Sequence, residues 1–166
     1  MKIDFISPMG EAFWPALNRT ETYKGKDTGK FTMKLVLTGK ALEDMRTKIN
    51  DALVDAYGPK KAEAVWKEKP PIKTTKDGSK AFIKYTANAV INDKPRIIAL
   101  FDSQDNLITR PLSIGSGSII RVNGSMSLFE AKDPGMWFSM NSIQVIKYVE
   151  YVPGGGFAHV PDGFIG

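Results

Sequence analysis

The strongest constraint on the fold is a strictly alternating segment, residues 30–37, that is followed directly by a helical pattern. Its apolar side chains occupy every second position and would share one face: Phe31, Met33, Leu35 and Leu37. Alternation with period two predicts a half-buried β-strand. From Lys40 the apolar residues recur at helical spacing, and Tyr57-Gly58-Pro59 ends the pattern. A second short helical turn is predicted from Pro59 to Lys67.

Further strand patterns follow the helical segment. They cover about residues 80–91, 95–102, 117–129 and 136–150, and Asp133-Pro134-Gly135 predicts a hairpin turn between the last two. Such a series of strands with short turns predicts a mainly β fold, a small barrel or a sandwich, in preference to a parallel α/β sheet. Helical insertion 40–67 separates the first long strand from the next. We expect one domain over 1–152 and a flexible C-terminal tail over 153–166, which is rich in Gly and Pro and lacks a core pattern.

Positive charge is concentrated in one part of the chain. Residues 24–84 carry 15 Lys and Arg against 8 Asp and Glu, whereas the segments before and after each sum to −1. In the strand that begins at Lys80, an aromatic, Phe82, alternates with lysines on the expected outer face. Lysines that meet phosphates and a ring that meets a base are the features of a surface for unpaired nucleic acid.

The candidate nucleic-acid-binding residues are the lysines of this region, two aromatics and one arginine on a polar strand face. They are Lys24, Lys26, Lys30, Lys34, Lys73, Lys76, Lys80, Phe82, Lys84, Arg121 and Trp137. Other interpretations stay open for several of them. Phe82 would equally suit packing under the helical insertion, Trp137 would suit packing at a sheet edge, and Lys24, Lys26 and Lys30 would suit a solvated loop.

The sequence offers little for catalysis. With no Cys and a single His, neither disulfides, thiol chemistry nor a His/Cys metal site is available, and we predict no metal, no cofactor and no enzymatic activity. Asp102 and Asp105 fit a turn better than a metal site. Segment 24–30 lacks the spacing of a phosphate-binding P-loop and leads into a strand. No segment approaches the roughly 18 apolar residues of a membrane span, and the absence of Cys suits a reducing cytoplasm.

Several strings, taken in their order, resemble the bacteriophage single-stranded DNA-binding proteins of the OB-fold type. The strings are Phe13-Trp14-Pro15-Ala16-Leu17-Asn18, Gly29-Lys30-Phe31-Thr32-Met33, Ile114-Gly115-Ser116-Gly117-Ser118 and Ser142-Ile143-Gln144-Val145. The resemblance implies an OB-fold-like antiparallel barrel of five or six strands with the helical insertion. It also implies coating and protection of single-stranded DNA, with little sequence preference, during phage replication and recombination.

The same resemblance implies phage or host replication proteins as partners and the cytoplasm of an infected bacterium as the location. A homodimer is a further possibility for the oligomeric state. One departure is the tail, which has one acidic residue where such proteins often end in an acidic segment that closes on an aromatic. Two other functions remain as alternatives. One is a structural β-domain of a virion or assembly whose basic face binds another protein, and the other is a carboxylate-dependent nuclease.

Overall fold

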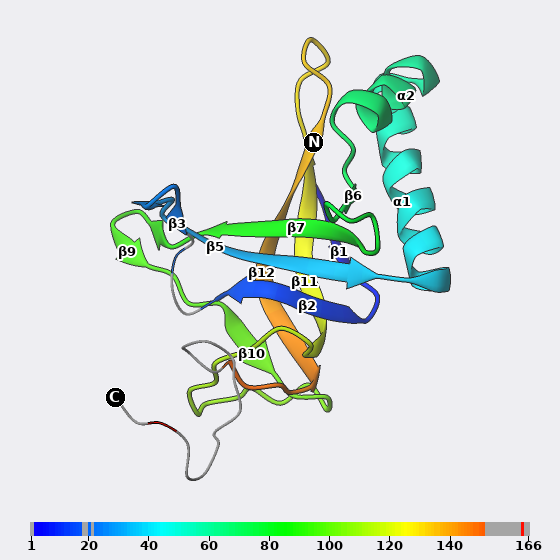
Figure 1. Cartoon of the computed structure of the whole chain (residues 1–166). Helices are drawn as coiled ribbons and strands as arrows, with labels where there is room; N and C mark the ends of the chain where they lie inside the picture. Colours follow the sequence, from blue (N-terminus) through cyan, green and yellow to red (C-terminus); the bar gives the residue numbers. More distant parts are fainter. Residues whose placement is uncertain (1, 18–19, 21, 152–163, 165–166) are drawn as a thin grey trace.

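The computed structural model describes residues 2–17, 20, 22–151 and 164, and Figure 1 shows a strand-rich body with the helices at one side. The main sheet contains β1 (Lys2–Ile6), β2 (Gly10–Ala16), β5 (Lys30–Leu37), β6 (Lys73–Thr74), β7 (Ala81–Asn88), β10 (Ala99–Phe101), β11 (Ile119–Leu128) and β12 (Met136–Lys147). Two small hairpins are β3 (Thr22–Tyr23) with β4 (Lys26–Asp27), and β8 (Val90–Ile91) with β9 (Lys94–Pro95). The helices are α1 (Gly39–Tyr57) and α2 (Pro59–Glu68).

Five of the strands close into a ring in the order β11, β2, β5, β7, β12, because β11 also pairs with β12. An odd number of strands cannot alternate in direction all the way round, so one neighbouring pair must be parallel. That pair is β12 with β7, and the short β10 also lies parallel to β12. The OB-like barrel with helices between the first long strand and the next is confirmed, but it is not antiparallel throughout.

The predicted alternation builds the barrel core. The four alternating apolar side chains of β5 are buried, as are the inward residues of β7, Ile83 and Tyr85. Burial of this apolar surface is the main favourable term of folding. On the helical side, α1 buries Met45, Ile49 and Leu53. The helical insertion is thus confirmed as two helices, which meet at Gly58 with φ of 86°, a value that glycine adopts without strain.

The strand boundaries differ from expectation in the second half of the chain. The predicted strand 80–91 divides into β7 and β8, and the strand predicted over 95–102 is reduced to β10, preceded by Pro95 in β9. Residues 96–98 form no strand. Ile97 is 86% exposed and Ile98 is 5% exposed. Of these two neighbouring apolar residues, both predicted to lie in one strand, the first therefore faces solvent and the second faces the core. The last strand ends at Lys147 instead of residue 150.

Strands β1 and β2 were not predicted from the sequence. Two inward residues of β2, Gly10 and Ala12, are small, because the strand lies close against β5. A Cβ on Gly10 would come 2.6 Å from the carbonyl oxygen of Val36, and Ala12 is completely buried. Residues as small as these do not give the alternating pattern of large apolar side chains by which a strand is predicted. Apart from exposed Phe164, the predicted tail 153–166 lies outside the described residues. None of the described helices has the length and apolarity to cross a membrane.

Candidate nucleic-acid interface

One cross-strand row on the outside of the sheet brings lysines and aromatics together. The pairing sets Lys2 of β1 opposite Ser127 of β11, and Ser127 opposite Trp137 of β12. On the other side, Phe13 of β2 lies opposite Lys34 of β5, which lies opposite Lys84 of β7. Trp137 and Lys84 line one cavity, because Phe138 and Tyr85, the residues that follow them, are register partners. The outward residues share a face because strand side chains alternate. We call these six residues the outer row: Lys2, Ser127, Trp137, Phe13, Lys34 and Lys84.

Three adjoining cavities flank the outer row. The first, of about 620 Å³, contains Lys2, Lys30 and Trp137. The second, of about 520 Å³, shares Trp137 and Thr86 with it and lies between the α2–β6 connection and β12. The third, of about 500 Å³, lies around Lys34 beside the β6–β7 loop.

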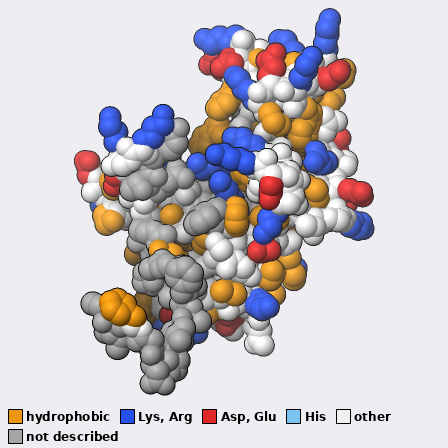
Figure 2. All heavy atoms as spheres, in the orientation of Figure 1, with side chains coloured by type: hydrophobic (Ala, Val, Ile, Leu, Met, Phe, Trp, Pro, Cys, Tyr) orange, Lys and Arg blue, Asp and Glu red, His pale blue; other side chains and the backbone are white. Residues whose placement is uncertain are grey.

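The walls of these cavities are strongly basic. Among the described residues, the positively charged side chains that line the cavities outnumber the carboxylates, which are those of Glu68 and Asp77. The cations are Lys2, Lys30, Lys34, Lys69, Lys73, Lys76, Lys80, Lys84 and Arg96. Figure 2 shows Lys and Arg side chains gathered in the middle of this face, beside hydrophobic surface. A groove with such an excess of positive charge attracts polyanions.

Two aromatic side chains, one in the outer row and one beside it, are open to solvent. Trp137 is 47% exposed and Phe129 is 44% exposed, and both line the first cavity with Ser139 and Asn141. Arg96 borders the same cavity, where its guanidinium donates to the carbonyl of Met140 at 3.2 Å and to Asn141 Oδ1 at 2.8 Å. Large exposed rings beside cations are suited to stacking on planar ligands.

The expectation that Phe82 is exposed is wrong. The residue does lie on the outer face, opposite Val36 and Lys73, but its side chain is only 7% exposed. The ammonium of Lys34 lies 4.9 Å from the centre of its ring. The aliphatic stem of a lysine covers apolar surface while its charge remains in water. The short strand β6 adds further cover, so Phe82 forms the floor of the third cavity.

Lys80 is engaged within the protein. Its ammonium lies 3.9 Å from the carboxylate of Glu11 and 5.2 Å from the ring centre of Phe13. A surface ion pair of this length is weak, so the lysine stays available for another anion. It borders the third cavity together with Lys76, which extends the basic surface beyond the outer row.

The loop that carries Lys76 and Lys80 is held by one carboxylate. Asp77 accepts hydrogen bonds from the hydroxyls of Thr75 and Ser79, at 2.5 and 2.7 Å, and from the backbone N–H of Ser79 at 3.0 Å. These bonds favour the charged form and lower the pKa of Asp77 to about 2. The loop therefore keeps a defined geometry at neutral pH, although it is exposed.

The structure brings eight of the eleven predicted residues to the three cavities: Lys30, Lys34, Lys73, Lys76, Lys80, Phe82, Lys84 and Trp137. Lys24 lies at the turn between β3 and β4, and Lys26 lies in β4. Arg121 lies on β11, opposite Gln144 of β12. None of these three lines the cavities, and contact of each with nucleic acid stays a prediction. Lys2, Lys69, Arg96 and Phe129 were not predicted, because only the tertiary fold brings them to this face.

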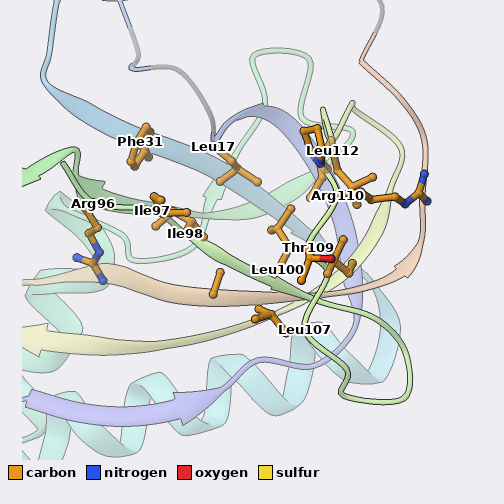
Figure 3. Close-up of a pocket in the computed structure, with 14 residues that line it drawn as sticks. Leu17, Phe31, Arg96, Ile97, Ile98, Leu100, Leu107, Thr109, Arg110 and Leu112 are labelled. Carbon is orange, nitrogen blue, oxygen red and sulfur yellow. The ribbon is translucent and has the colours of Figure 1, made fainter.

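A fourth cavity, of about 620 Å³, has a different character. Figure 3 shows it between β10 and the segment that follows, and most of its lining is aliphatic. Arg96 and Arg110 lie toward opposite ends of this view, and none of the described residues that line the cavity is a carboxylate. Because it lacks the row of cations, we do not include it in the nucleic-acid interface.

Among residues 2–17, 20, 22–151 and 164, no group of three or more His, Cys, Asp or Glu side chains is placed to hold a metal ion. Asp102 accepts hydrogen bonds from the backbone N–H groups of Asn106 and Gln104, both at 2.9 Å, and these bonds, that from Asn106 above all, lower the pKa of its carboxyl. This is the predicted turn around Asp102 and Asp105, where Asp105 has φ of 63°.

No protein-family model matches the sequence, and no curated protein matches it. Solved structures share the fold. The crystal structure of gp2.5, a single-stranded DNA-binding protein encoded by bacteriophage T7, aligns with a TM-score of 0.67 at 15% identity over the full length of both chains. The single-stranded DNA-binding protein of bacteriophage Enc34 aligns with a TM-score of 0.55 at 11% identity, covering 97% of this chain and 87% of that one.

A structure of the Enc34 protein in complex with single-stranded DNA also aligns, with a TM-score of 0.53 at 11% identity, covering 90% of this chain and 86% of that one. The barrel with its helical insertion is therefore the fold of phage single-stranded DNA-binding proteins, as the sequence resemblance predicted. At these identities the likeness concerns the fold.

Proposed function

We propose that the protein binds single-stranded DNA along the outer row. One observation carries this proposal: exposed Trp137 lies in a row with Lys2, Lys84 and Lys34, and the three cavities beside this row are lined, among the described residues, by nine cations and two carboxylates. The lysines neutralise phosphates, and release of the counterions bound to DNA drives association. Unpaired bases stack on Trp137 and Phe129. A duplex offers no free bases for this contact, because its bases are already stacked on one another.

Weak sequence preference follows from this mode of binding. Every base has a π-face, so stacking on Trp137 discriminates little between bases. Polar side chains beside it, Thr86, Ser139 and Asn141, offer hydrogen bonds to base edges or sugars without a fixed pattern of donors. The protein therefore acts as a general cover for single strands, by binding and not by catalysis.

The biological role that we propose is to coat and protect single-stranded DNA during phage DNA replication and recombination, in the cytoplasm of the infected bacterium. The shared fold with the T7 and Enc34 proteins, whose names state that they bind single-stranded DNA, supports this role. Phage or host replication proteins are the proposed partners, and a homodimer is compatible with the proposal. Lys24, Lys26 and Arg121 remain candidate contacts at the margins of the interface.

The alternative, a structural domain whose basic face binds another protein, is less well supported. An acidic protein surface would be matched by lysines alone and would not call for a half-exposed Trp137 among them. Large rings at protein interfaces are usually surrounded by contacts that exclude water, whereas the cavities on both sides of Trp137 are open and basic. The combination of rings and cations favours a flexible polyanion with planar groups.

A direct comparison of ligands tests the proposal. Labelled oligo(dT) and a duplex of equal length are titrated with the protein in fluorescence anisotropy, with and without magnesium. We expect tight binding of the single strand, weak binding of the duplex and no cleavage of either. Equal affinity for the two DNA forms, or no affinity for either, would contradict the proposal, and cleavage that requires magnesium would indicate a nuclease.

A further inference from the structure

The last residue of α1 reaches across to the β11–β12 hairpin. The hydroxyl of Tyr57 donates a short hydrogen bond to the carbonyl of Phe129, and it lies 3.0 Å from the carbonyl oxygen of Gly135. These two carbonyls belong to the residues that close the hairpin, where the N–H of Phe129 donates to Gly135 at 2.9 Å. A single side chain of the helical insertion therefore holds both strands of the hairpin at its base.

Helix α2 and its C-cap residue, Lys69, add two contacts to the tip of the same hairpin. The ammonium of Lys61 donates to the carbonyl of Ala131 at 3.3 Å, and that of Lys69 donates to the carboxylate of Asp133 at 2.8 Å. Both contacts are exposed, so each contributes little alone. Together with the half-buried hydroxyl of Tyr57 they form a brace between the helices and the hairpin.

The brace acts on the stacking surface because of what the hairpin carries. Phe129 packs directly on buried Gly135, where an added Cβ would lie 2.9 Å from ring atom Cδ2. Phe129 and Trp137 both border the first cavity. The positions of both exposed rings therefore depend on the geometry of the hairpin base. Holding a binding surface in place before the ligand arrives reduces the entropy that binding must overcome.

We propose that Tyr57 is a positioning residue for base stacking, which it controls by fixing the hairpin that presents Phe129 and Trp137. This inference rests on the proposed function, since it concerns the same interface. Tyr57 lines none of the three cavities and carries no charge, so its effect is confined to the bases and leaves the phosphate contacts unchanged. The helical insertion is then part of the binding apparatus as well as a cover for the core.

The test compares two ligands that differ only in their bases. Tyr57→Phe removes the hydroxyl and keeps the ring, and its affinity is measured for oligo(dT) and for an abasic deoxyribose-phosphate oligomer of equal length at low salt. We expect roughly a three- to tenfold loss for oligo(dT), the fold-change that corresponds to one hydrogen bond, and no change for the abasic oligomer. Tyr148→Phe is the matched control, because it also removes a tyrosine hydroxyl that donates to a backbone carbonyl. The Tyr148 hydroxyl donates to the carbonyl oxygen of Ser113 at 3.3 Å, and Ser113 lines none of the three cavities.

A second variant displaces the ring without altering Tyr57. Gly135→Ala places a methyl group against Phe129, and we expect the same selective loss for oligo(dT). Thermal midpoints identify any variant that is not folded at the assay temperature. Absence of wild-type binding to oligo(dT) would contradict the proposed function itself. Wild-type binding that neither variant changes, or equal losses for both ligands, would overturn the positioning role alone.

Discussion

In the proposed mode of binding, Trp137 is the residue on which base stacking depends most directly, because it lies between two basic cavities with 47% of its surface exposed. Trp137→Ala should lower the affinity for oligo(dT) by about 1–3 kcal/mol, the usual contribution of a stacked base. Trp137→Phe retains a ring and should recover most of the loss. Isothermal titration of each variant gives the affinity. An alanine variant that binds as tightly as the wild type would exclude stacking at this position.

Phe82 should behave as a packed residue. Its ring is 7% exposed beneath Lys34, and we expect Phe82→Ala to lower the free energy of unfolding by about 3–5 kcal/mol through the cavity it leaves. Urea denaturation measures this change. A loss below about 1 kcal/mol would show that the ring is not packed, since such small losses are typical of surface positions.

Phe82 and Trp137 also mark how far residue-level prediction extends. Alternation places both on the outer face of their strands, and the structure agrees for both. Their exposure differs because Phe82 has Lys34 above it and β6 beside it, whereas Trp137 borders open cavities. A period of two fixes the face of a strand residue, but the cover over that face comes from elements distant in sequence.

At the scale of elements, the loop between β6 and β7 depends on the charge of Asp77. Hydrogen bonds from Thr75 and Ser79 lower its pKa to about 2 from an ordinary value of 3.8. A lowered pKa means that the contribution to stability is complete above the ordinary value and is lost as the pH falls toward 2.

We therefore predict that the Ser79 amide stays protected from hydrogen exchange at pH 4 and loses protection only as the pH approaches 2. In Asp77→Ala the protection should be low at every pH, and affinity for oligo(dT) should fall modestly because Lys76 and Lys80 lose their fixed positions. NMR titration of the Asp77 carboxyl provides the check. A midpoint near 3.8 would contradict the hydrogen-bonded turn.

The elements that the sequence predicted are the long periodic ones. Strand β5, both helices and the strands β7, β11 and β12 follow from apolar periodicity, which is most reliable in long segments. Strand β2 was missed because it makes its core contacts through Gly10 and Ala12. The parallel pairing of β7 with β12 was missed because strand direction around a ring depends on the number of strands, which no local pattern contains.

For the whole molecule, we predict that the affinity for single-stranded DNA responds to salt. If the lysines of the three cavities neutralise four to six phosphates, the logarithm of the binding constant should fall with the logarithm of salt concentration with a slope of about −3 to −4, at −0.7 per phosphate. Anisotropy titrations over a range of salt concentrations give the slope. Binding that does not respond to salt would exclude the phosphate contacts.

The position of the candidate interface was predictable only in part. Charge counting identified residues 24–84 as the basic region, and the cavities lie along β5, β6 and β7 within it. Lys2 and Arg96 lie outside that segment and reach the interface because β1 and the β9–β10 connection border the same cavity. Local charge reveals a basic segment, whereas the set of cations on one face depends on strand order.

If DNA follows the outer row as proposed, reversal of charge within the row should weaken binding, whereas the same reversal elsewhere should not. Lys34→Glu with Lys84→Glu alters two register partners on β5 and β7. Lys60→Glu with Lys67→Glu makes the same change of net charge on exposed positions of α2 outside the cavities. We predict that the row variant stays folded, loses more than roughly tenfold in affinity for oligo(dT) and has a salt slope smaller by roughly 1.4, for two lost phosphate contacts. The α2 variant should stay close to wild type, and equal losses in the two variants would contradict a defined path along the row.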